Sequence, residues 1–112
     1  MAYIYLVQMN IPAEREAEFN RIYGTEHVPM LSQVPGVHKV TRYRLETSED
    51  PRMQKYLAIY EIDSPEIVAS KAWQEAGEWG RWAPKIRPHT TERYRSLFKE
   101  ISWANTPRPN KV

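Results

Sequence analysis

Residues 19–37 read FNRIYGTEHVPMLSQVPGV and predict an amphipathic helix that leads into a strand. Phe19, Tyr23 and His27 recur at four-residue steps, so they lie on one face of that helix. Because proline donates no backbone hydrogen bond and its ring crowds the preceding turn, Pro29 should bend or end the helix close to His27. The stretch therefore predicts an ionisable imidazole on an inward-facing stripe, in the last turn of a helix.

Length and composition indicate one folded domain. The chain has 112 residues, 41% of them hydrophobic, which is typical of a globular protein. The formal net charge is +2, with both signs interspersed, so the charge gives no reason to expect nucleic acid or a membrane as partner. The absence of cysteine excludes disulfides, thiolate metal sites and cysteine nucleophiles. The apolar opening, residues 2–9, is too short to span a bilayer, and we expect a cytoplasmic protein.

The expected elements alternate between strands and helices. Their ranges are 2–9, 12–28, 37–45, 55–62, 64–80 and 92–101. Ser64 should cap the second helix, and Ser70 could divide it into two pieces. Residues 80–91, GRWAPKIRPHTT, predict a long connection without regular structure, of the kind that often forms a lid or a binding loop. A single domain should cover residues 1–103, followed by a polar proline-containing tail, residues 104–112.

This order predicts an α+β ferredoxin-like fold, βαββαβ. Its four-stranded antiparallel sheet has the strand order 4-1-3-2. The runs 2–9 and 55–62 are apolar on both faces, as the two central strands should be. Two helices can cover only one face of the sheet, so the other apolar face predicts a homodimer that packs sheet against sheet into an α+β barrel.

Residues 19–37 also resemble the signature of EthD-type proteins in the dimeric α+β barrel superfamily. In that signature an aromatic residue and a tyrosine precede an E-H-x-P element and a P-G-V run. The matching residues here are Phe19, Tyr23, Glu26, His27, Pro29, Pro35, Gly36 and Val37. The resemblance implies the same fold and places His27 in a cleft between sheet and helices. The superfamily includes isomerases, cyclases, lyases, decarboxylases, cofactor-free monooxygenases and haem-handling proteins.

His27 is the candidate catalytic residue. An imidazole with an ordinary pKa of about 6.5 can take and return a proton at neutral pH. The alternative is a histidine that bonds the last free carbonyls of its helix. Tyr23, one turn earlier, could orient the ring or donate to a substrate oxygen.

Aromatic residues could form the walls of a ligand site. The candidate substrate-binding residues are Tyr5, Tyr23, Tyr60, Trp73, Trp79, Trp82 and His89. Trp82 is the strongest of the tryptophans for this role because it lies in the long connection, whereas the others could simply fill the core. An arginine could anchor a substrate carboxylate, but the sequence does not choose among Arg42, Arg44, Arg81, Arg87 and Arg93.

Several chemistries are disfavoured by the motifs. The three histidines lack H-x-H or H-E-x-x-H spacing, so no metal site is expected, and there is no G-x-S-x-G or P-loop pattern. The leading hypothesis is a cofactor-independent isomerase, cyclase or lyase that acts on a small unsaturated or aromatic acid, ketone or lactone. Two alternatives stay open: a non-catalytic small-molecule-binding or stress-associated protein, and a small monooxygenase or haem-handling protein.

Overall fold

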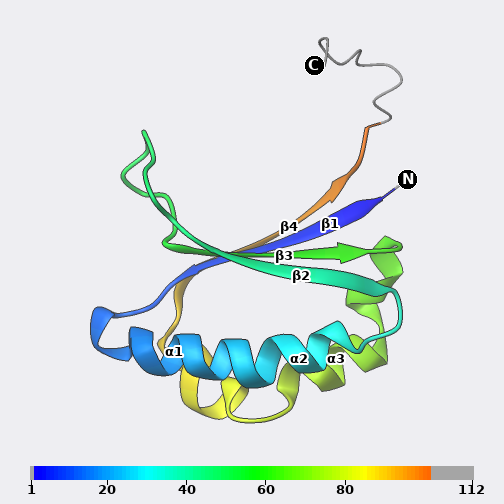
Figure 1. Ribbon diagram of the computed structural model, residues 1–112, viewed down its shortest axis with the longest axis horizontal. Helices are drawn as coiled ribbons and strands as arrows, with labels where there is room; N and C mark the ends of the chain where they lie inside the picture. The colour runs from blue at the N-terminus through cyan, green and yellow to red at the C-terminus, as the bar shows by residue number, and fades with distance from the viewer. Residues whose placement is uncertain (1, 102–112) are drawn as a thin grey trace, which may run out of the picture.

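A twisted four-stranded antiparallel sheet carries all the described helices on one face (Figure 1). The computed structural model describes residues 2–101, so the predicted tail, residues 104–112, lies outside them. The strands are β1 Tyr3–Asn10, β2 Val37–Arg44, β3 Tyr56–Ile62 and β4 Thr91–Lys99. Their order, β2-β3-β1-β4, is the predicted 4-1-3-2 order counted from the opposite edge, and it confirms the ferredoxin-like fold.

The central position of β1 and β3 follows from their composition. Both strands are apolar on both faces, whereas β2 and β4 carry charged residues and lie at the edges. Tyr5 of β1 lies opposite Tyr60 of β3, and these side chains belong to the face that the helices cover. Two aromatic side chains are therefore fixed in the middle of the inner face.

The first helical segment passes through Pro29 instead of ending near it. α1, Glu16–Ile22, is followed by a π-helical turn, Tyr23–His27, and then by α2, Val28–Ser32. In the π-turn the Val28 amide donates to the Tyr23 carbonyl, one residue further back than in an α-helix. Pro29 falls in the first turn of α2, where its missing donor is tolerated. Termination near His27 was one of two predicted outcomes, and it is wrong.

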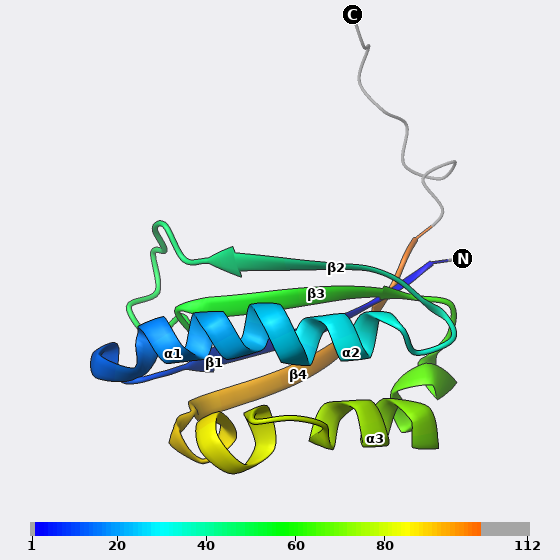
Figure 2. The same cartoon turned by 60° about the horizontal axis from the view of Figure 1, so that its bottom comes forward.

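The second helical segment is divided at Ser70, as the sequence allowed. A 3₁₀-helix, Pro65–Ala69, precedes α3, Lys71–Glu78. The Ser70 hydroxyl accepts a hydrogen bond from the Trp73 amide at 3.1 Å and so caps α3. Figure 2 shows α1 and α2 as one rod with α3 alongside.

Residues 80–91 are helical over most of their length, so the prediction that they lack regular structure is wrong. Trp82–Ile86 forms a π-helical turn and Arg87–His89 a 3₁₀-helix. Trp82 and Ile86 are four residues apart, so both side chains point to the core, where they are 4% and 0% exposed. Burial of these two side chains gives the segment a reason to be helical in spite of its prolines.

The other face of the sheet is largely apolar, and no helix within residues 2–101 covers it. Successive side chains of a strand point to opposite faces of the sheet, so every second residue of each strand lies on this face. It carries Ile4 and Leu6 of β1, Ile59 of β3, and Tyr94 and Phe98 of β4, the last two 59% and 52% exposed. Within residues 2–101, no helix has the length and hydropathy needed to cross a bilayer.

Candidate functional site

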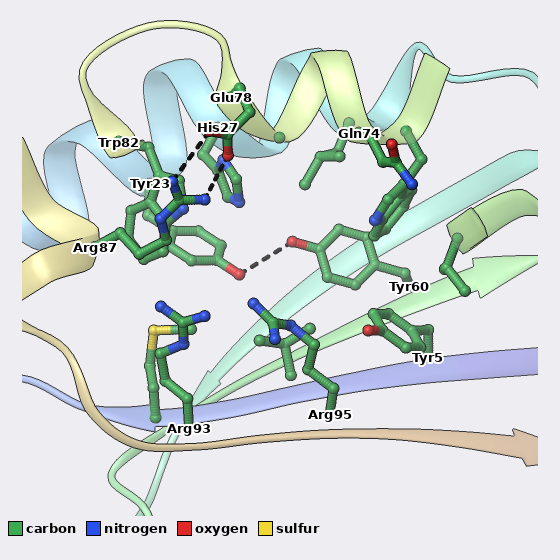
Figure 3. Close-up of a pocket in the computed structure, with 16 residues that line it drawn as sticks. Tyr5, Tyr23, His27, Tyr60, Gln74, Glu78, Trp82, Arg87, Arg93 and Arg95 are labelled. Carbon is green, nitrogen blue, oxygen red and sulfur yellow. Dashed lines mark hydrogen bonds and ion pairs between the residues drawn. The ribbon is translucent and has the colours of Figure 1, made fainter. Parts of the chain in front are cut away.

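A pocket of about 500 Å³ lies between the inner face of the sheet and the helical layer. Its walls come from β1, β3, β4, the first π-turn, α3 and the segment that starts at Trp82 (Figure 3). The aromatic lining residues are Tyr5, Tyr23, Tyr60, Trp73 and Trp82, and the ionisable ones are His27, Glu78, Arg87, Arg93 and Arg95. The pocket therefore combines aromatic surfaces with an excess of positive charge.

His27 forms part of the wall and has lost almost all contact with solvent. It is 7% exposed, and its Nδ1 is buried with no hydrogen-bond partner among the described residues. The ring stacks on Trp82, with centroids 4.6 Å apart and planes 29° apart, and meets the edge of Tyr23 at 4.9 Å. Because its helix continues to Ser32, His27 is not at a helix end, and its Nδ1 bonds no free carbonyl.

The surroundings of His27 favour the uncharged imidazole. Burial and, to a smaller extent, the nearby Arg87 guanidinium lower the pKa of His27 to about 4, against the opposing effect of Glu78. At neutral pH the ring is therefore a neutral base with an unused nitrogen. A buried polar group without a partner is unusual in a folded protein and calls for a functional explanation.

Two buried phenols meet beside the imidazole. The hydroxyls of Tyr23 and Tyr60 are 3.0 Å apart, so one donates to the other. Burial raises the pKa of both hydroxyls, most strongly that of Tyr60, and keeps them protonated. Figure 3 shows this pair in the centre of the pocket. Protonated phenols can donate a hydrogen bond to an oxygen that becomes negative during a reaction.

An ion pair between Glu26 and Arg81 holds the turn that carries Trp82 against the turn that carries His27. Glu26, in the π-turn, accepts a hydrogen bond from the Arg81 amide at 2.9 Å and also binds the Arg81 side chain. Gly80 precedes this contact with φ +81°, a conformation that glycine adopts most easily. The carboxylate of Glu26 therefore joins the turn that carries His27 to the turn that carries Trp82.

The three pocket arginines differ in their partners. Arg87 is paired with Glu78, with an Nη2–Oε1 distance of 3.1 Å. Arg93 and Arg95, two residues apart on β4, have no acidic partner among residues 2–101. Arg42 lies elsewhere: it bonds Asn20 Oδ1 at 2.8 Å and covers the ring of Tyr23. The structure thus singles out the pocket arginines, which the sequence could not do.

Six of the eight predicted site residues line one pocket. They are Tyr5, Tyr23, His27, Tyr60, Trp73 and Trp82. Trp79 does not join them, because it follows the last turn of α3 in an extended conformation and is 51% exposed. His89 ends the 3₁₀-helix and also lies outside the lining.

Sequence reasoning missed Arg95, Gln74 and Glu78 as pocket residues. A signal for Arg95 was present, because residues two apart on a strand share a face and Arg93 was already a candidate. Gln74 and Glu78 are four residues apart on α3, so they share a face of that helix. Within residues 2–101, no group of three or more metal-ligating side chains is placed to hold a metal ion.

Solved structures share this fold at low sequence identity. An ethyl tert-butyl ether D (EthD) family protein from Bacillus halodurans is 15% identical, with a TM-score of 0.64 over 88% of this chain and 99% of that one. SnoaB, a cofactor-independent oxygenase from Streptomyces nogalater, is 16% identical, with a TM-score of 0.61 over 88% and 92%. The haem degrader MhuD from Mycobacterium tuberculosis, with two haems in its active site, is 17% identical, with a TM-score of 0.62 over 88% and 95%.

These likenesses confirm the resemblance to EthD-type proteins at the level of the fold. No curated protein matches the chain significantly in sequence. A family model described as "Domain of unknown function (DUF4286)" matches residues 2–102, nearly the whole chain. The chain therefore belongs to the DUF4286 family.

Proposed function

We propose that the protein is a cofactor-independent isomerase, cyclase or lyase that acts on a small unsaturated or aromatic acid, ketone or lactone. His27 accepts a proton from the substrate and returns it. The observation that carries this proposal is a neutral imidazole, packed against Trp82 and Tyr23, in the wall of an aromatic pocket that also contains arginines.

The chemistry needs a base, an oxyanion partner and an anchor, and the pocket offers a candidate for each. His27 removes a proton from carbon next to a carbonyl group. The Tyr23–Tyr60 pair donates to the enolate oxygen that forms, and an arginine holds a carboxylate. The low pKa of His27 is compatible with this role, because a bound anion would raise that pKa when the proton is transferred.

The test is a pair of identical substitutions at two histidines. A substrate is first sought by screening aromatic and lactone acids for products and for a raised melting temperature. His27→Gln should then lower kcat/KM by roughly 10²–10⁴-fold, and His89→Gln, outside the pocket, should leave it unchanged. In the pH profile of kcat/KM for the wild type, the fall on the acid side should lie near the His27 pKa of about 4. Unaltered turnover in His27→Gln would refute the proposal, and binding without any product would favour the non-catalytic alternative.

The second candidate is a small monooxygenase or haem-handling protein. Two solved structures of this fold are described as an oxygenase and a haem degrader. The aromatic walls and arginines fit a flat, acidic macrocycle, and His27 lies in the same wall, where its Nε2 would offer an iron ligand. Haem, when bound, would supply oxygen activation. A Soret band on haem addition that is lost in His27→Gln supports this candidate, and no such band together with no oxygen uptake contradicts it.

We further propose that the protein is a cytoplasmic homodimer joined through the helix-free face of the sheet. An apolar face of this extent is rarely left in water by a lone soluble domain. A two-fold partner would cover it and leave the pocket, on the opposite side of the sheet, accessible.

A further inference from the structure

The proposed chemistry needs one arginine as an anchor, whereas the pocket offers two, Arg93 and Arg95, without an acidic partner within residues 2–101. We infer that they form a paired carboxylate site, and that the ligand of this pocket is a small planar molecule with two acidic groups. The inference rests on the proposed ligand pocket but not on proton transfer by His27, so the two can fail separately.

The geometry of β4 brings both arginines to the same wall. Residues at alternate positions of a strand share a face, and their Cα atoms are about 7 Å apart. Arg95 lies opposite Val7 of β1, which also lines the pocket. Figure 3 shows both guanidinium groups rising from β4 toward the Tyr23–Tyr60 pair. Each arginine can therefore present its own planar fork to a separate carboxylate.

The charges of the lining residues match a dianion. Three arginines and one glutamate line the pocket, and the imidazole is neutral. Because Glu78 is already paired with Arg87, the positive charges of Arg93 and Arg95 are left without a protein carboxylate in the described part of the chain. Their charges reach the ligand space, because both lower the pKa of the Tyr23 hydroxyl against the effect of burial.

The shape of the lining argues for a flat ligand. Tyr5 and Tyr60 both meet the ring of Trp73 edge-on, with centroids 5.7 Å and 5.2 Å away. On the other side Trp82 stacks on His27. Aromatic surfaces at both ends and arginines along one wall suit a conjugated ring or chain better than a compact ion such as phosphate.

Binding titrations with matched acids test the inference. The probes are benzoate and the three benzenedicarboxylates, measured calorimetrically on the full chain. At least one diacid should bind wild type ten or more times more tightly than benzoate. Arg93→Gln and Arg95→Gln should each reduce that preference to threefold or less. Arg44→Gln, an exposed arginine of β2 outside the pocket, should leave it unchanged.

Melting temperatures close to wild type show that each variant is folded. Equal affinity for benzoate and the diacids, a preference that survives both substitutions, or no binding of any diacid would overturn the inference. Haem binding without diacid binding would also overturn it, since the arginines would then serve a macrocycle. A diacid preference that persists in His27→Gln while turnover is lost would support both the inference and the proposed function.

Discussion

His27 shows how a single side chain can be kept neutral by its neighbours. Trp82 and Tyr23 cover its ring, Nδ1 has no partner within residues 2–101, and Arg87 opposes protonation. An unfolded chain would place the same imidazole in water, with a pKa of about 6.5. Folding therefore lowers the proton affinity of this residue, and the stability of the protein must depend on pH.

The expected pH dependence has a definite sign. Between pH 6.5 and about 4 the unfolded state binds a proton that the folded state does not, so the free energy of unfolding falls as the pH falls. The His27 contribution lost is about 2–3 kcal/mol across this window. Urea unfolding of wild type and His27→Phe at about pH 7 and about pH 4.5 measures it. The wild type should lose more stability than the variant, and parallel losses would contradict the burial argument.

At the level of elements, two helical turns meet through Glu26 and Arg81. The strands could be predicted because short apolar runs of β-preferring residues between turn residues are a local signal, and the start of α3 because Ser70 caps it. The cap predicted at Ser64 is wrong, because its side chain makes no capping hydrogen bond. The π-turn and the helical turns after residue 81 could not be predicted in the same way. Both depend on tertiary contacts between segments 55 residues apart, which no local pattern contains.

Gly80 and Gly77 make a matched pair for testing this junction. The backbone of Gly80 has φ +81°, and a Cβ added there would lie 2.8 Å from Glu26 Oε1. A Cβ added at Gly77 would meet nothing within 4 Å. Gly80→Ala should therefore lower the free energy of unfolding by about 1–2 kcal/mol. Gly77→Ala, inside α3, should raise it by up to about 1 kcal/mol. Urea denaturation compares them, and a neutral Gly80→Ala would show that the junction relaxes without cost.

At the scale of the molecule, one face of the sheet encloses the pocket and the other is covered by no helix of residues 2–101. The aromatic half of the pocket could be predicted, because Tyr23 and His27 share a helix face and Tyr5 and Tyr60 lie on central strands. The charged half could not be chosen from sequence. Which arginines reach the pocket depends on the register that sets Arg95 opposite Val7 and on the helical turns that carry Arg87, and the predicted strand order gives neither.

A charge in the middle of the uncovered face should separate the proposed dimer. Leu6 lies on this face, opposite Ile59 and Ser96. Leu6→Lys should weaken association at least a hundredfold, because the lysine must be desolvated without a partner. Trp79→Lys, which changes an exposed apolar residue of the helical layer on the other side of the sheet, should have no effect. Light scattering after gel filtration gives the masses, and a wild type that elutes as a monomer at all concentrations would end the dimer proposal.

The π-turn at Tyr23–His27 is one residue longer than an ordinary helical turn would be. Deleting the exposed Thr25 would therefore leave a backbone that can close as a regular α-helix, so the shortened chain keeps a hydrogen-bonded rod. The rest of the rod would keep its register, because a π-turn takes up its additional residue within one turn of the helix. Tyr23 and His27 would then be three residues apart instead of four, while the apolar residues of α2 would still face the core. The additional residue thus changes the spacing of two pocket side chains and leaves the path of the helix unchanged.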